Sequence, residues 1–120
     1  MSKTRGIRGA ITITSNTKEE IKKAVKELLD ATLDVNQISL EDIAFTIFTV
    51  TKDINAAFPA AFARTECGFR NVPMMCYEEM NVEGAIEKCI RVMLVVNTDK
   101  KQDEIVHQYL GGAKMLRPDL

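Results

Sequence analysis

The chain has 120 residues, of which 46% are hydrophobic and 28% charged, and its formal net charge is −1. This composition fits one ordinary globular domain over residues 1–120, and the near-neutral charge argues against bulk nucleic-acid binding, which needs clustered positive charge. No stretch approaches the ~20 apolar residues of a membrane span, and no signal-peptide core follows the start. We therefore expect a cytoplasmic protein that binds neither nucleic acid nor membrane.

The cysteines and the single histidine leave little material for metal or redox chemistry. Cys67, Cys76 and Cys89 are odd in number and show no CxxC spacing. That usage favours free thiols over disulfides or a zinc site. His107 is the one histidine of the sequence, which argues against a metal site built from histidines and against a Ser-His hydrolase. We expect no metal and no cofactor.

The first predicted elements are a strand and an amphipathic helix. Residues 7–14 alternate, with isoleucines on one face, as in a strand with one apolar side. Thr17 to Glu20 matches a capping box, and the apolar residues that follow recur with helical spacing. This pattern predicts a helix over about 18–33.

The middle of the chain predicts two strands and a short helix. Residues 43–51 are rich in β-branched and aromatic residues and are typical of a strand. Pro59 suits the first position of a helix and Gly68 the residue beyond its end, which predicts a helix over 59–67. A third strand is expected over 72–77.

The last third begins with an expected loop over 80–87, followed by the most apolar run of the chain at 89–96. That run lacks Gly and Pro and is predicted to be a strand buried on both faces. Residues 101–110 favour a helix that stops at the two glycines after it, and 113–120 favour an extended tail.

The predicted order is strand, helix, strand, helix, strand, strand, helix. It indicates an α/β (α+β) fold with a mixed β-sheet and helices on one face. Two helices cover only one side of such a sheet. Because the other side is also apolar, we expect identical subunits to bury it in a homo-oligomer.

Arg91 is the most informative residue, because it lies in the middle of the apolar run. Period-2 geometry places it on the same face as Met93 and Val95. An arginine keeps its charge, and desolvating an unpaired one costs several kcal/mol. An Asp or Glu partner is the ordinary explanation; an anionic ligand or a side chain that reaches back to water are the alternatives.

Other polar residues are weak signals when taken one at a time. Arg8, Arg64 and Arg117 each fit a solvated side chain. Glu79 fits a solvated strand end, and Tyr109 fits a packing residue. Their order and spacing carry more information than any one of them.

A set of motifs spans nearly the whole chain in a fixed order: Arg8-Gly9-Ala10, Phe58-Pro59-Ala60 leading to Arg64, Cys76 with Glu79, Cys89-Ile90-Arg91-Val92-Met93, Tyr109-Leu110, and Leu116-Arg117-Pro118-Asp119-Leu120. The set resembles the small trimeric α/β class of chorismate mutase, as distinct from the all-helical class. Any one motif alone would be weak, but together they are specific.

The resemblance implies an isomerase that converts chorismate to prephenate by an intramolecular [3,3]-sigmatropic (Claisen) rearrangement in Phe and Tyr biosynthesis. No covalent intermediate, metal or cofactor is implied. The substrate is a dianion with a breaking ether bond, so catalysis must come from orientation and from cationic donors. Several arginines in a chain of neutral charge suit that demand. The family also implies a homotrimer that forms a pseudo-α/β-barrel with sites between subunits.

The resemblance assigns roles to individual residues. Arg91 would donate to the ether oxygen and to a carboxylate, and Glu79 would accept from the ring hydroxyl, which makes these two the catalytic pair. The substrate-binding residues implied are Arg8, Phe58, Ala60, Arg64, Met75, Cys76, Tyr109, Leu116 and Arg117.

Within that set, Phe58, Ala60 and Arg64 would come from the neighbouring subunit, and Leu116 and Arg117 from a mobile tail that closes over the site. The chain departs from the family pattern at Ala61, where a lysine is frequent, and at Met75, where a smaller polar residue is frequent.

These assignments favour a substrate over a protein carboxylate as the partner of Arg91. Two alternatives stay open: a non-catalytic trimeric protein that binds a small carboxylate, and an enamine/imine deaminase of related architecture. The combination of Arg8, Glu79, Arg91 and Tyr109 separates them, because only chorismate mutase needs all four together.

Overall fold

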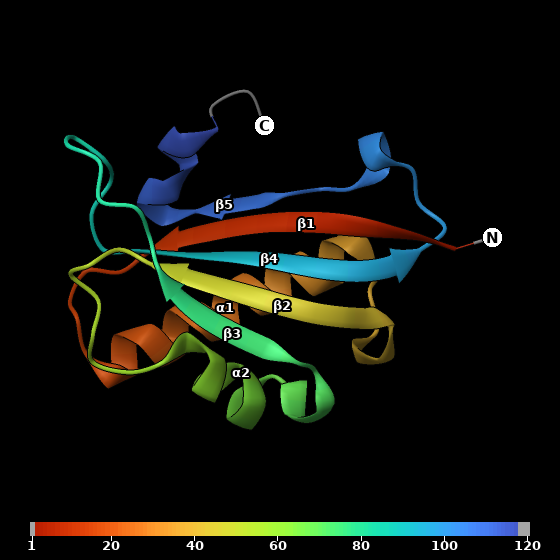
Figure 1. The fold of residues 1–120 in the computed structure, drawn as a ribbon, viewed down its shortest axis with the longest axis horizontal. Coiled ribbons are helices and arrows are strands. Elements are labelled where there is room, and N and C mark those ends of the chain that lie inside the picture. The colour runs from red at the N-terminus through yellow and green to blue at the C-terminus, as the bar shows by residue number, and fades with distance from the viewer. Residues whose placement is uncertain (1, 118–120) are drawn as a thin grey trace.

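A computed structural model describes residues 2–117 and contains one mixed β-sheet with α-helices on one of its faces (Figure 1). Short 3-10 turns join several of the elements. The strands and α-helices are β1 (Lys3–Thr12), α1 (Lys18–Asn36), β2 (Ile43–Val50), α2 (Pro59–Glu66), β3 (Met74–Glu78), β4 (Cys89–Thr98) and β5 (Gln108–Leu110).

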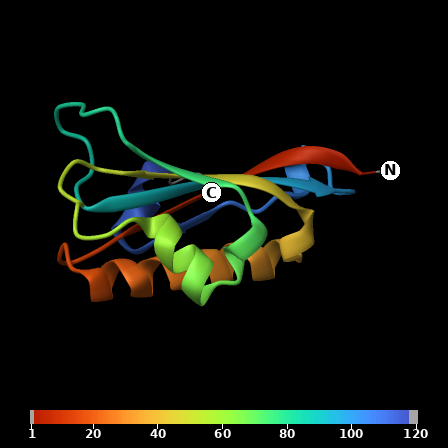
Figure 2. The same ribbon diagram turned by 60° about the horizontal axis from the view of Figure 1, so that its bottom comes forward.

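The sheet has five strands in the order β3-β2-β4-β1-β5. β4 is central and pairs antiparallel with both β1 and β2, whereas β3 and β5 join the two edges in parallel. Both α-helices lie on the same side of this sheet, and the loop between β3 and β4 rises on the opposite side (Figure 2). The mixed sheet with helices on one face, expected from the sequence, is confirmed.

α1 begins where the sequence predicts and runs three residues further. The Thr17 side chain accepts a hydrogen bond from the backbone N–H of Glu20, which satisfies one of the free donors of the first turn. The reciprocal half of the capping box is absent, since the Glu20 carboxylate accepts from Thr14 Oγ1 instead. The helix ends at Asn36, and the C-cap residue Gln37 adopts a left-handed conformation with φ 53°.

The core lies between the two helices and the sheet. Leu28 and Leu29 of α1 and Phe48 and Leu94 of the central strands are fully buried there. α2 starts at Pro59, as predicted, and Gly68 after it has φ +77°, a conformation that glycine adopts without steric cost. Burial of the helix-facing side of the sheet in this core stabilises the fold of the single chain.

The opposite face of the sheet is open in the single chain. Along β4, Ile90, Val92, Leu94 and Val96 are buried toward the helices, but Arg91 and Met93 are half-buried or exposed on the open face. The prediction that β4 is buried on both faces is therefore wrong for the single chain. The reason is that no element among residues 2–117 covers the centre of this face.

Two expectations for the C-terminal third are wrong. Residues 101–110 were expected to form a helix, but they contain only a 3-10 turn at Gln102–Glu104 followed by β5. Gly111–Leu116 form a 3-10 helix rather than an extended tail, and the expectation for 118–120 lies outside the described residues. Neither α-helix of residues 2–117 combines the length and the hydrophobicity of a transmembrane span.

Candidate active site

One row of residues crosses the sheet from edge to edge and forms the floor of the site. Strand register aligns Tyr77 with Thr49, Thr49 with Arg91, Arg91 with Ala10, and Ala10 with Tyr109. Side chains directly opposite each other in neighbouring strands point to the same face. The methyl group of Ala10 thus separates Arg91 from Tyr109 and leaves room between the two larger side chains.

A cavity of about 220 Å³ lies over this row on the open face. We call it the arginine pocket; its lining residues are Arg8, Gly9, Ile47, Thr49, Arg91, Val92, Met93 and Tyr109. The structure therefore brings together three residues, Arg8, Arg91 and Tyr109, that the sequence placed far apart along the chain. Their guanidinium and hydroxyl groups suit a small carboxylate ligand.

Glu79 meets Arg91 at the edge of this pocket. Its Oε1 lies 2.9 Å from Arg91 Nε, with 19% of the glutamate side chain and 40% of the arginine side chain exposed. The Arg91 N–H does not point along this line, so the buried Nε has no hydrogen-bond acceptor among the described residues. The contact is an ion pair that leaves a directed donor available.

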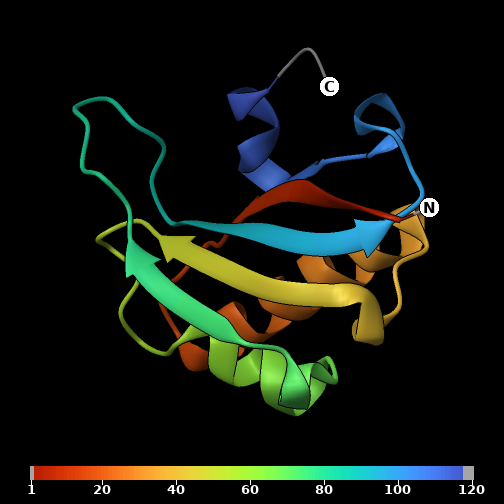
Figure 3. The same ribbon diagram turned by 45° about the vertical axis from the view of Figure 1, so that its right-hand side comes forward.

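The expectation that a substrate rather than a protein carboxylate faces Arg91 therefore needs correction. Arg91 does have a carboxylate partner, Glu79, which is itself a predicted site residue. Both residues also line a larger hollow of about 890 Å³ whose other walls come from the segments 51–53 and 80–88. That 80–88 loop projects past the ends of β2 and β3 (Figure 3).

His107 lies beside Arg8 on the β1–β5 side of the pocket. His107 Nδ1 accepts a hydrogen bond from the backbone N–H of Arg8 at 2.9 Å. Burial lowers the pKa of His107, and the charges of Arg8 and Arg117 lower it further.

The C-terminal 3-10 helix closes one end of the row. Ala113 is fully buried in a small cluster with Ala10 and Cys89, against which Tyr109 and Leu116 pack. Gly112 N–H donates to Thr12 Oγ1 at 2.8 Å and ties the helix to β1. Burial raises the pKa of the Cys89 thiol to about 11, so this cysteine stays protonated and is a packing residue rather than a nucleophile.

A second group of predicted residues lies elsewhere in the same chain. Phe58 and Cys76 line a separate hollow of about 450 Å³ at the start of α2. Phe58 is 71% exposed, Arg64 points into solvent from α2, and Ala60 packs partly into the core. A single chain therefore does not bring these residues to the arginine pocket. Met75 is exposed on the open face of the edge strand β3.

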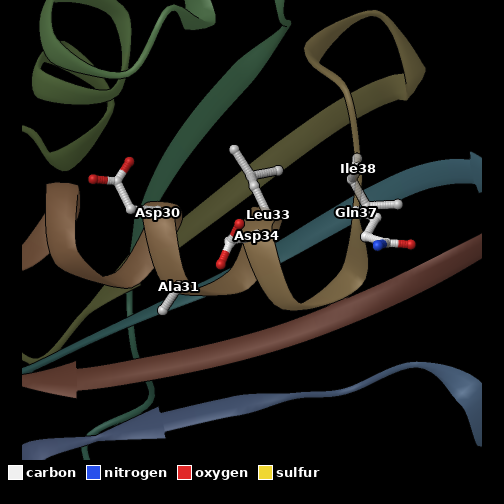
Figure 4. A pocket seen from close by; sticks show the side chains of 6 residues that line it. All are labelled: Asp30, Ala31, Leu33, Asp34, Gln37 and Ile38. Atoms are coloured by element: carbon white, nitrogen blue, oxygen red, sulfur yellow. The ribbon is translucent and has the colours of Figure 1, made fainter.

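A further hollow along the C-terminal half of α1 has the wrong charge for an anion (Figure 4). Asp30 and Asp34 contribute two carboxylates, and its other lining residues are Ala31, Leu33, Gln37 and Ile38. It lies along α1 on the helix side of the sheet, whereas the arginine pocket lies on the open face. The arginine pocket is the better candidate for an anionic substrate.

Comparison with known proteins agrees with this geometry. Residues 4–120 match the family described as chorismate mutase type I. The chain belongs to this family. It is 45% identical over 116 residues to chorismate mutase AroH of Bacillus subtilis (strain 168), an alignment that covers 97% of this chain and 91% of that protein. It is 48% identical over 117 residues to chorismate mutase AroH of Thermus thermophilus, covering 97% and 95%.

A solved structure of a chorismate mutase from Clostridium thermocellum superposes with a TM-score of 0.90 at 48% identity. The superposition covers 92% of this chain and 98% of the other. The family expected from the sequence motifs is therefore confirmed. Sequence reasoning missed two residues of this type I chorismate mutase: Thr49, which lines the pocket, and His107, which accepts a hydrogen bond from the backbone of Arg8 beside it. The alternation of β2 places Thr49 on the face of Phe45 and Ile47, which was the available signal.

Proposed function

We propose that this chorismate mutase rearranges chorismate to prephenate in the arginine pocket, and that a neighbouring subunit completes the site. The reaction is intramolecular and needs no nucleophile or proton transfer. What it needs is a rigid cationic environment for a dianion whose ether bond breaks. The observation that carries the proposal is the buried Arg91 Nε, which lies 2.9 Å from Glu79 but has no hydrogen-bond acceptor among the described residues, in a pocket that also holds Arg8 and Tyr109.

Arg91 is the proposed transition-state donor. As the C–O bond breaks, the ether oxygen gains negative charge, and a fixed guanidinium stabilises that charge more than it stabilises the ground state. β4 is the central strand, so Arg91 is anchored by ladders on both sides. The rigid backbone keeps the donor in place without reorganisation during the reaction.

Glu79, Arg8 and Tyr109 are the proposed orienting groups. The Glu79 carboxylate accepts from the ring hydroxyl and offsets the partial positive charge that develops on the ring. Arg8 and Tyr109 hold a substrate carboxylate from the β1–β5 side of the pocket. Together these contacts select the compact conformer in which the reacting carbons meet.

The remaining site residues are proposed to arrive from a second subunit of a homotrimer. Phe58, Ala60 and Arg64 lie away from the arginine pocket of their own chain, and the open face next to the pocket is apolar. Packing this apolar face against a neighbouring subunit would bury it. It would also bring the hollow of Phe58 and Cys76 to the arginine pocket of the neighbouring subunit. Leu116 and Arg117 are proposed to close over the bound substrate.

An absorbance assay tests the proposed activity. Purified protein mixed with chorismate should remove the diene absorbance and yield prephenate far faster than the uncatalysed reaction. The expected acceleration is on the order of 10⁶-fold, the lower end of ordinary enzymatic enhancements. Tight binding of chorismate without acceleration would contradict the proposal and would favour the carboxylate-binding alternative.

A further inference from the structure

Thr49 occupies a position from which it can control the catalytic pair. In the β2–β4 ladder it lies directly opposite Arg91, on the same open face, and it lines the arginine pocket. Its side chain is half-buried. Thr49 therefore sits within the site but carries no charge that could itself stabilise the transition state.

The Thr49 hydroxyl is bonded to Glu79. Oγ1 donates to Glu79 Oε1 at 2.8 Å, and Arg91 Nε lies 2.9 Å from that same oxygen. The backbone N–H of Glu79 donates to the carbonyl of Val50 at 2.8 Å, which fixes where the side chain starts. Both side-chain contacts converge on Oε1, and no hydrogen bond to Oε2 is found within residues 2–117.

We propose that Thr49 is a positioning residue that holds Glu79 Oε1 so that Oε2 faces the substrate's ring hydroxyl and Arg91 stays open to the ether oxygen. This inference rests on the proposed function. A carboxylate beside a guanidinium prefers a forked pair with two parallel hydrogen bonds. The observed pair is not of that kind, because Arg91 Nε lies 2.9 Å from Oε1 without making a hydrogen bond to it. Thr49 competes for Oε1 and keeps the carboxylate out of the forked geometry.

Thr49→Val removes the hydroxyl with little change of shape, and Thr49→Ser keeps it. We expect kcat to fall about 10-fold or more in T49V, the value of one hydrogen bond to a charged group, while KM changes less than about 3-fold. T49S should retain at least about half of the wild-type kcat. If T49V kept wild-type kcat, or if T49S lost as much as T49V, the positioning role would be wrong.

Thr46→Val is the matched control. Thr46 lies on the same strand but faces the core, where its buried hydroxyl has no hydrogen-bond partner among the described residues. Removing that hydroxyl should leave kcat unchanged. A similar loss in T46V would mean that any Thr-to-Val change in β2 disturbs the sheet, which would also overturn the proposal.

A double-mutant cycle with Glu79→Ala separates positioning from a general structural effect. If Thr49 acts through the Glu79 carboxylate, T49V should change kcat less than about 2-fold in the E79A background. A loss equal to that in the wild-type background would overturn the inference. The wild-type rate is measured first, because an inactive wild type would remove the proposed function, whereas an active enzyme with a silent T49V would remove only this inference.

Discussion

His107 couples the conformation of β1 to protonation. Its Nδ1 accepts from the backbone N–H of Arg8, a bond that exists only while that nitrogen is unprotonated. Burial and the charges of Arg8 and Arg117 lower the pKa of His107 below its ordinary 6.5 in the folded state. The unfolded chain therefore takes up the proton first as the pH falls.

The free energy of unfolding should consequently decrease as the pH drops below about 6.5, until the pH passes the lower pKa of the folded state. The contribution is fully present above the unfolded pKa. Urea unfolding at fixed protein concentration between about pH 7.5 and about pH 5.5 measures it. His107→Asn keeps an acceptor but does not titrate, so its profile should be flatter; an identical slope in both proteins would contradict this role.

At the scale of elements, Asp53 holds the end of the 80–88 loop, which connects Glu79 to β4. Its Oδ1 and Oδ2 accept from the backbone N–H of Lys88 at 3.1 and 2.9 Å, just before β4 begins. Burial opposes ionisation, yet hydrogen bonds from Thr51 and Lys88 hold the pKa of Asp53 below its usual value. Glu79 and Arg91 lie at the two ends of the clamped segment.

Asp53→Ala should therefore loosen this loop and spread the positions of Glu79 and Arg91. We expect faster amide hydrogen exchange at residues 80–89, a loss of about 1 kcal/mol in stability, and a lower kcat/KM. Asp30→Ala, on the exposed side of α1, is the control and should change none of these. Unchanged exchange at Lys88 and Cys89 in D53A would show that the carboxylate is not what orders the loop.

The elements that the sequence predicted well are those whose local pattern agrees with their packing. α1 has a capping residue at Thr17 and a clear apolar stripe, so local and tertiary preferences coincide. Residues 101–110 show the opposite case. They contain good helix formers, but the buried Asn36 side chain bonds both the carbonyl and the N–H of Val106 at 2.8 Å and holds the chain extended beside β1. Asn36 and Val106 are 70 residues apart, so a local sequence pattern cannot predict this contact.

The candidate site also contains residues that the sequence pattern indicated and residues that it did not. Alternation along β1 predicts that Arg8 leaves the core, whereas the apolar run around Arg91 predicted a strand buried on both faces. The register of β1 with β4 shows that the two arginines lie close together on the same open face. Alternation along β2 also places Thr49 on that face, but a threonine in a strand is ordinary, so the pattern did not mark it as a site residue. Its importance depends on Glu79 folding back from the end of β3, and only the three-dimensional structure reveals that contact.

The whole molecule leaves an apolar surface uncovered. Phe45, Met75 and Met93 are 42%, 58% and 36% exposed on the open face of the sheet, next to the arginine pocket. A patch of this kind marks an interaction surface. In the proposed homotrimer, the two separated groups of site residues are the two halves of one site: Arg91 and Glu79 form one half, and Phe58 and Arg64 the other.

Subunit mixing tests this shared site most directly. Arg91→Lys and Arg64→Ala, each impaired alone, are unfolded together in equal amounts and refolded into mixed trimers. In random trimers, about a quarter of the interfaces pair an intact Arg91 with an intact Arg64, so about a quarter of the wild-type kcat/KM should return. R91K mixed with Glu79→Ala is the control; it should recover nothing, because one subunit supplies both residues. No recovery with R64A, or recovery in the control, would contradict an active site assembled from two chains around Arg91.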